Sequence, residues 1–250
     1  MSVQFYFAAS LAAATVGLAK GGMPIVGVLA VPILALTISP VAAAAILLPI
    51  FIVSDMYGLY LFRRDFDARN LAILIPASLV GVGIGWATAS VTSEAAVTLL
   101  VGFIGLAYCA NVALAKGRER PARCADVPGG LFWGSLTGFT SFVSHSGAPP
   151  FQMYVLPQRL DKVSFVGTST ILFAVVNLAK LGPYYALGQL SGDNLTAGAW
   201  VLPVALLATW LGARLVRVVP ERTFYTVVEV ALFVVSLKLT YDGASGLLNS

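Results

Sequence analysis

Two short glycine–proline breaks are the positions at which this sequence could bind a small anion. Gly22-Met23-Pro24 is followed by seven residues and Pro32, and Gly147-Ala148-Pro149 is followed by seven residues and Pro157. A helix that begins at such a break presents unbonded N–H groups and the positive end of its dipole, and glycine lets a ligand approach the backbone closely. Proline suits the first turn of that helix, where its missing N–H costs nothing. Two such helix starts predict one anion site that both breaks share.

Polar side chains beside the breaks, and on the segment after the second break, complete the predicted site. The candidate substrate ligands are Lys20, Gly21, Gly22, Met23, Ser144, His145, Ser146, Gly147, Ala148, Thr168, Ser169, Asn177 and Lys180. A structural alternative exists for most of them. The glycines could be helix-packing points, and His145 could be a buried histidine with its hydrogen bonds satisfied. The side chains of 168–170 and Asn177 could bond across helices, and Lys180 could extend its ammonium group to the membrane interface. Asp55 matches Lys180 in the repeat and either pairs with a neighbouring helix or binds a coupling proton, and the sequence does not decide between the two. No metal or cofactor is expected.

The composition indicates that these residues lie in a membrane. Of 250 residues, 58% are hydrophobic and 10% are charged, and the mean hydropathy is +0.89. The runs Gly21–Ser54, Asn70–Ser93 and Ala95–Ala115 carry no charge, and each reaches the roughly 20 residues that cross a bilayer as a helix. The sequence therefore predicts an all-α polytopic membrane protein. Its net charge of +4 comes from basic residues in short loops, which set orientation in the membrane, so no nucleic-acid partner is expected.

The breaks divide the chain into two halves with the same order of elements. We expect a first transmembrane repeat at 1–116, a cytoplasmic linker at 117–128 and a second repeat at 129–250. In each half a broken helical hairpin precedes three transmembrane helices. The expected segments are 3–19, 24–36, 41–62, 70–89 and 94–115, then 129–144, 149–158, 163–187, 195–216 and 222–240. A shift of 125 residues aligns Tyr60 with Tyr185, and a shift of 127 aligns Pro76 with Pro203.

Loop charge predicts how the two halves are related. Lys116, Arg118, Arg120 and Arg123 give the central loop the strongest basic bias, which places it in the cytoplasm. Alternation from that loop puts corresponding loops of the two halves on opposite sides of the membrane, as in an inverted repeat. Inversion requires each broken hairpin to enter and leave on one side. Both chain termini are then expected outside.

The segments around the breaks carry a resemblance to a known family. GLAKGGMPIVGVLAVPIL in the first half, and SHSGAPPFQMYVLP with DKVSFVGTSTILFAVVNLAKLGPYYALG in the second, resemble the sulfite exporter TauE/SafE family. The resemblance implies a multi-pass protein of the bacterial inner membrane that transports sulfite, sulfoacetate or similar organosulfonates. With the broken helices, it predicts a secondary transporter that works by alternating access. Its partners would be the anion and membrane lipid, and homo-oligomer formation is left open.

Three other functions stay open at this point: an anion channel, a transporter of another small organic anion, and an intramembrane hydrolase. A hydrolase needs a nucleophile and a base on facing elements. His145, however, adjoins Ser144 and Ser146, and neighbours on a helix point in different directions. We therefore expect no enzymatic activity.

Overall fold

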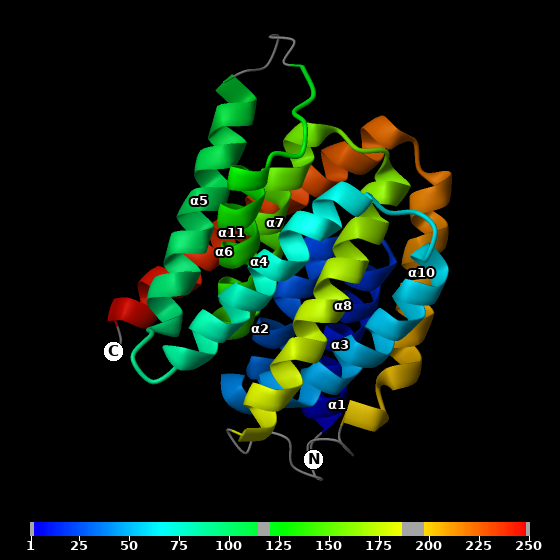
Figure 1. Ribbon diagram of the computed structural model, residues 1–250. Coiled ribbons are helices and arrows are strands. Elements are labelled where there is room, and N and C mark those ends of the chain that lie inside the picture. The colour runs from blue at the N-terminus through cyan, green and yellow to red at the C-terminus, as the bar shows by residue number, and fades with distance from the viewer. Residues whose placement is uncertain (1–2, 115–120, 187–197, 249–250) are drawn as a thin grey trace. The chain divides into compact units, whose positions relative to one another are not determined.

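A computed structural model describes residues 3–114, 121–186 and 198–248 (Figure 1). Within these ranges all regular secondary structure is helical. Six of the described helices are long and apolar enough to cross a membrane, namely Val3–Gly21, Ala42–Phe62, Ala68–Ala87, Glu94–Leu114, Lys162–Ala186 and Glu221–Leu248. The predicted all-α polytopic membrane fold is confirmed.

The two halves of the chain contain the same order of elements. The first half holds α1 (Val3–Gly21), η1 (Pro24–Leu29), α2 (Ala30–Ala35), α3 (Pro40–Phe62), α4 (Ala68–Ala87) and α5 (Glu94–Leu114). The second holds α6 (Val127–Ser144), α7 (Ala148–Val155), η2 (Leu156–Gln158), α8 (Lys162–Ala186), α10 (Leu202–Val218) and α11 (Glu221–Leu248). Both breaks fall where the sequence places them. The expected start of the span 195–216 lies outside the described residues.

Helix ends follow local capping chemistry. Ser39 precedes α3, and its hydroxyl accepts a hydrogen bond from the N–H of Ala42 at 3.3 Å. Asp126 precedes α6, and its carboxylate accepts from the N–H of Gly129 at 2.7 Å. Each cap satisfies an N–H group that the first helical turn leaves unbonded, and each of these helices has a proline in that turn.

Helix α11 continues eight residues past the expected end at 240, through two glycines. An added Cβ at Gly243 would lie 2.4 Å from the backbone nitrogen of Leu99, and one at Gly246 would lie 2.9 Å from Ala95 Cβ. The glycines therefore let α11 approach α5 closely. This packing compensates for the low helix propensity of glycine, which local sequence alone reads as a break.

The helices form two compact units. Unit 1 is Met1–Asp67 with Lys162–Pro220, and unit 2 is Ala68–Asp161 with Glu221–Ser250. Helices α1 to α3 therefore pack with α8 and α10, whereas α4 and α5 pack with α6, α7, η2 and α11. Each unit combines elements from both halves of the sequence.

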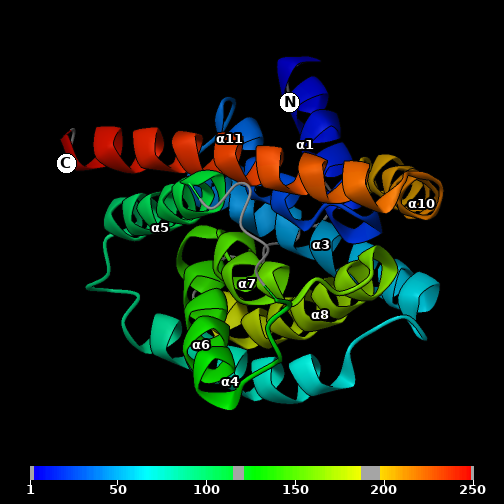
Figure 2. The same cartoon turned by 90° about the horizontal axis from the view of Figure 1, so that it is seen from above.

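The packed pairs correspond to one another under the sequence repeat. In unit 1, α1 packs along α10 and α3 along α8. In unit 2, α6 packs along α4 and α11 along α5, as Figure 2 shows. Because α6 is the repeat counterpart of α1 and α4 that of α10, the first pair of each unit is equivalent. This pairing supports the repeat, and its inversion across the membrane stays a prediction.

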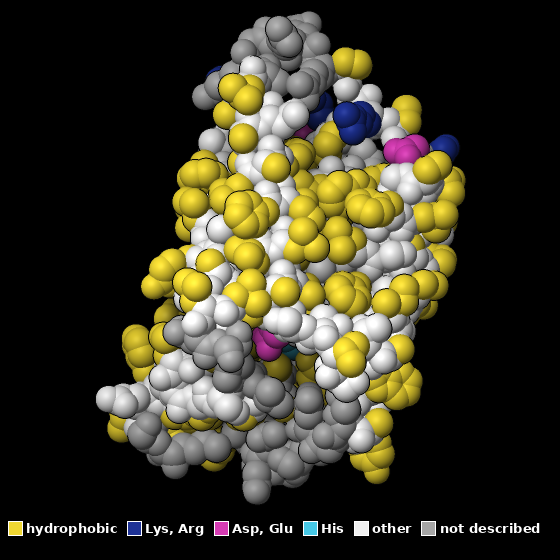
Figure 3. Space-filling view, turned by 90° about the vertical axis from the view of Figure 1, so that its left-hand side faces the viewer, with side chains coloured by type: hydrophobic (Ala, Val, Ile, Leu, Met, Phe, Trp, Pro, Cys, Tyr) yellow, Lys and Arg dark blue, Asp and Glu magenta, His cyan; other side chains and the backbone are white. Residues whose placement is uncertain are grey.

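Large apolar side chains cover the outer faces of α5 and α11. Phe103 is 56% exposed and Val230 is 57% exposed. Figure 3 shows a broad band of hydrophobic side chains on one face of the molecule, with lysine and arginine side chains gathered toward its upper end. An apolar surface of this extent matches contact with lipid tails.

Candidate functional site

The first break, in unit 1, uses most of its backbone donors locally. The N–H groups of Gly22 and Met23 both donate to the carbonyl of Leu18, each at 3.0 Å. The next element, η1, is a six-residue 3₁₀ helix that begins at Pro24, which has no N–H. The first break therefore offers a ligand fewer backbone N–H groups than the start of a regular α-helix.

Gly21 and Gly22 lie against α10. An added Cβ would lie 2.3 Å from the carbonyl oxygen of Thr209 at Gly21, and 2.1 Å from Val216 Cγ2 at Gly22. The helix-packing alternative accounts for both glycines, because any side chain here would force α1 away from α10. A substitution at Gly22 would thus disturb helix packing before it could report on a ligand.

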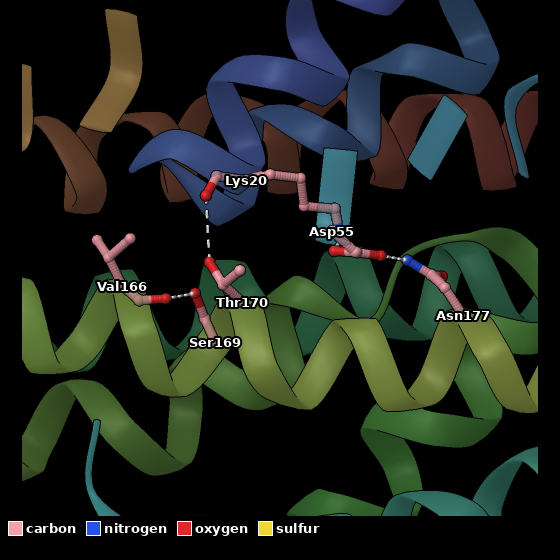
Figure 4. A network of polar contacts seen from close by, with 6 residues as sticks. All are labelled: Lys20, Asp55, Val166, Ser169, Thr170 and Asn177. Carbon is pink, nitrogen blue, oxygen red and sulfur yellow. Dashed lines mark hydrogen bonds and ion pairs between the residues drawn. The ribbon is translucent and has the colours of Figure 1, made fainter. Parts of the chain in front are cut away.

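A buried ion pair lies immediately before the first break. Lys20, in the last turn of α1, places its Nζ 2.7 Å from Oδ1 of Asp55 on α3. The other carboxylate oxygen, Oδ2, accepts a hydrogen bond from Nδ2 of Asn177 on α8 at 2.7 Å (Figure 4). The side chain of Lys20 is 6% exposed and that of Asp55 is 0% exposed. Three helices of unit 1 therefore meet at one charged pair.

Two aromatic rings flank the Lys20 ammonium group. Its Nζ lies 5.2 Å from the ring centroid of Phe51 and 5.4 Å from that of Phe173. Ring faces attract a cation and replace part of its lost hydration. The ammonium group is thus held in place by one carboxylate and two rings.

Lys180 is the third charged member of this group, which we call the charge cluster: Lys20, Asp55 and Lys180. The side chain of Lys180 is buried, at 1% exposure, so it does not extend to the molecular surface. It interacts electrostatically with both Lys20 and Asp55. With both lysines protonated and Asp55 ionised, the charge cluster has a formal charge of +1. Burial of an uncompensated charge is costly, so this cluster favours the approach of an anion.

One face of α8 positions these groups. Thr170, Phe173, Asn177 and Lys180 recur at intervals of three and four residues, which places them on the same side of the helix. Thr170 donates its hydroxyl to the carbonyl of Lys20 at 3.2 Å (Figure 4), and so ties α8 to the end of α1. This face of α8 brings its polar groups to the charge cluster.

Two other candidate ligands on α8 have structural partners. Thr168 accepts a hydrogen bond from the N–H of Asp67 at 2.8 Å, which fixes the chain between α3 and α4. The hydroxyl of Ser169 donates to the carbonyl of Val166 at 2.8 Å within α8. Hydrogen bonding within the protein accounts for both residues, as one of the sequence alternatives proposed.

At the second break, in unit 2, the chain changes direction at a residue with left-handed backbone geometry. His145 ends α6 with φ 52° and ψ 20°, and its N–H and that of Ser146 both donate to the carbonyl of Thr140. A side chain in this conformation costs about 1–2 kcal/mol relative to glycine. The sequence thus retains an imidazole at a position where glycine would fold more easily, and such strain is often found at functional sites.

The serines and small residues of the second break lie between α6 and α7. The hydroxyl of Ser144 donates to the carbonyl of Thr140 at 3.2 Å, and that of Ser146 donates to the carbonyl of Ser144 at 3.0 Å. Gly147 and Ala148 are buried where α7 begins. Both hydroxyl donors are used locally, so a ligand here would depend on other groups.

A residue that the sequence reasoning missed lies on α7. Gln152 is 0% exposed, and within the described part of the chain neither its Oε1 nor its Nε2 has a hydrogen-bond partner. Leaving such a group unpaired in the interior costs about 1–3 kcal/mol. The available signal was an amide four residues after Ala148 in an otherwise apolar short helix.

A cavity of about 940 Å³ opens within unit 2, between α5, α6, η2 and α11 and next to α7. Its charged lining consists of Arg123, Arg159 and Arg222 with Glu221 and Glu229. Arg123 and Arg159 lie in loops and Arg222 in the first turn of α11, at positions that the charge pattern predicts to be cytoplasmic. Met153 of α7 also lines the cavity, whereas Gln152 is not among its lining residues. An anion could therefore approach this part of α7 from the predicted cytoplasmic side.

The predicted ligands thus fall into two groups. Those of the first break and α8 lie in unit 1, and those of the second break lie in unit 2. Within unit 1, the structure joins Lys20, Asn177 and Lys180 with Asp55 in one buried group. A site shared by both breaks stays a prediction.

Comparison with protein families identifies the chain. The family described as sulfite exporter TauE/SafE matches residues 6–239 of the 250. The chain therefore belongs to this family, which confirms the resemblance found in the sequence, and membership implies a membrane transporter of sulfur-containing anions such as sulfite. Searches of curated proteins and of solved structures return no match.

Proposed function

We propose that this member of the sulfite exporter TauE/SafE family is a secondary transporter that carries sulfite or a small organosulfonate, such as sulfoacetate, across the bacterial inner membrane by alternating access. Family membership supports a sulfur-containing anion as the substrate. Among the chain's own residues, the main support for the proposal is the charge cluster, which buries two lysine side chains with a single aspartate.

Charge balance explains how the cluster would bind its substrate. The pair of Lys20 and Asp55 is formally neutral, so the remaining charge is that of Lys180. A monoanion beside Lys180 would bring the cluster to neutrality and remove the cost of the uncompensated cation. A sulfonate group carries one such charge, and its three oxygens can accept hydrogen bonds. Sulfoacetate carries a second negative charge on its carboxylate, which the cluster would balance with Asp55 protonated.

Asp55 is the proposed coupling residue, because it is the carboxylate of the cluster. Protonation of Asp55 would release the Lys20 ammonium group from its partner and leave two cations for the anion. Proton binding and anion binding would then support each other, which is the thermodynamic basis of coupled transport.

The cavity in unit 2 supports an access route from the cytoplasm. Three arginines against two glutamates give its lining an excess of positive charge. Such a lining raises the local concentration of anions and speeds their association. We propose that the anion approaches unit 2 from the cytoplasm through this cavity.

A binding screen on the purified protein tests the proposal. Sulfite, sulfate, thiosulfate, sulfoacetate and acetate are titrated separately, and a sulfur anion is expected to bind tightest. Reconstitution into liposomes then separates transporter from channel, because a transporter shows saturable flux and exchanges labelled for unlabelled anion. Tightest binding of acetate would indicate another organic anion as the substrate. Flux that does not saturate would indicate a channel.

A further inference from the structure

The start of α7, the helix that follows the second break, has few backbone N–H groups available to a ligand. Its second and third residues are Pro149 and Pro150, which have no N–H. The N–H of Phe151 already donates to the carbonyl of Gly147 at 3.3 Å. An anion at this helix start therefore has the N–H groups of Gly147 and Ala148 and must take its other donors from a side chain.

Gln152 is placed to supply them. It follows Ala148 by four positions, so the two residues lie on the same face of α7. Long side chains on a helix generally point back toward its N-terminus, and this preference favours a Gln152 carboxamide that lies over the first turn, near the break. The carboxamide is fully buried, and both of its polar atoms lack a partner among the described residues.

Close helix packing explains why another buried group in unit 2 has no hydrogen-bond partner, but it does not explain the unpaired amide of Gln152. The hydroxyl of Ser236 is also buried without a partner. Ser236, however, packs against α5, where an added Cβ at Gly105 would lie 2.0 Å from its Oγ. A small side chain at this position lets α5 and α11 approach each other. Gln152 is long and carries a donor group and an acceptor, so a buried apolar residue would be more stable unless a ligand pairs with the amide.

We propose that Gln152 is a direct ligand of the transported anion and selects anions that carry a hydrogen-bond donor of their own. This inference rests on the proposed function. The Nε2 group donates to an anionic oxygen, and Oε1 accepts from an O–H or N–H group of the same ligand. A fully deprotonated oxyanion offers only acceptors and would leave Oε1 unpaired. The favoured class among the proposed organosulfonates is therefore a small sulfonate with a hydroxyl group close to the sulfonate, and sulfoacetate, which has no donor, should bind less tightly.

Two probes of equal charge and similar size test this selection on the purified full-length protein. They are ethanesulfonate and 2-hydroxyethanesulfonate, titrated by calorimetry. One added hydrogen bond predicts that the hydroxyl compound binds the wild type roughly threefold to tenfold more tightly. Gln152→Met should weaken both and bring their affinities together. Ser236→Ala, the matched change at the other unpaired buried group, should keep the difference.

Folding and charge variants separate the outcomes. Gln152→Met should elute as a single species and unfold at the same or a higher temperature, because it replaces an unpaired amide with an apolar side chain. Gln152→Glu, which keeps the length but removes the donors and adds negative charge, should weaken both probes. Equal affinity of the two probes for the wild type, or a difference that survives in Gln152→Met, would overturn the inference alone. No binding of either probe, while sulfite still binds, would also overturn the inference alone, whereas no binding of either probe or of sulfite to the wild type would overturn the proposed function with it.

Discussion

Lys180→Met is the change that separates a binding role of the charge cluster from a structural one. The substitution keeps most of the length of the side chain and lowers the formal charge of the cluster from +1 to 0. Because Lys180 is 1% exposed, the variant removes a buried cation from the membrane interior. The Lys20–Asp55 pair, with its 2.7 Å contact, keeps both partners.

The two expected effects have opposite signs. Removing a buried charge that only a ligand compensates should leave the unfolding temperature of the empty protein unchanged or raise it. Anion affinity should fall, because a unit anion 4 Å from the ammonium group gains about 4 kcal/mol at an effective dielectric constant of about 20. Losing such a partner in a buried site costs about 2–5 kcal/mol, which raises Kd by about 30-fold or more.

The assay is calorimetric titration of sulfite, with thermal unfolding of the same preparation. Lys162→Met is the matched control, because Lys162 begins the same helix and donates to the carbonyls of Arg217 and Val219, away from the charge cluster. Its sulfite affinity should equal that of the wild type. The reasoning is refuted if Lys180→Met binds sulfite as tightly as the wild type. A clear loss of thermal stability in Lys180→Met would instead make Lys180 a structural partner of Asp55.

Three further predictions concern the buried pair, the second break and the orientation. Asp55→Asn should lower the free energy of unfolding by about 3–5 kcal/mol, because it leaves the buried Lys20 without its counter-ion, and Lys20→Met combined with Asp55→Leu should recover most of that loss in thermal unfolding. His145→Gly should raise the unfolding temperature by removing backbone strain at φ 52° and weaken sulfite binding in the same titration, whereas unchanged binding would place the imidazole outside the site. Reporter fusions at the two chain ends should both read as periplasmic, and a cytoplasmic C-terminus would contradict the inverted repeat.

The broken hairpins show how much of the fold can be predicted from local sequence. Both breaks and most ends of the described apolar spans were predicted within a few residues, with the C-terminal end of α11 as the main exception, because chain length across a bilayer and the backbone chemistry of glycine and proline act locally. The form of the segment after the first break was not predictable in the same way. It is 3₁₀ from Pro24 to Leu29 and α-helical only from Ala30. This segment packs against α1, and the sequence of the segment alone does not predict which residues of α1 it contacts.

The charged residues show the same limit of prediction from sequence. The repeat matched Asp55 with Lys180, and both are indeed buried. The cation in direct contact with Asp55 is nevertheless Lys20, from a helix 35 positions earlier in the chain. Which charge pairs with which depends on how α1, α3 and α8 pack, and a repeat alignment compares positions without giving distances between them.

The sequence by itself determined the solvent, the helical class, the two breaks and the family, because each depends on composition, on local backbone chemistry or on a motif that is continuous along the chain. Tertiary structure decided the partners. It showed that Gly21 and Gly22 pack against α10, that Lys20, Asp55 and Lys180 form one buried group, and that the amide of Gln152 has no partner within the described chain. The physical reason is that burial and pairing are properties of helix faces in contact, and those contacts join residues that are far apart in the sequence.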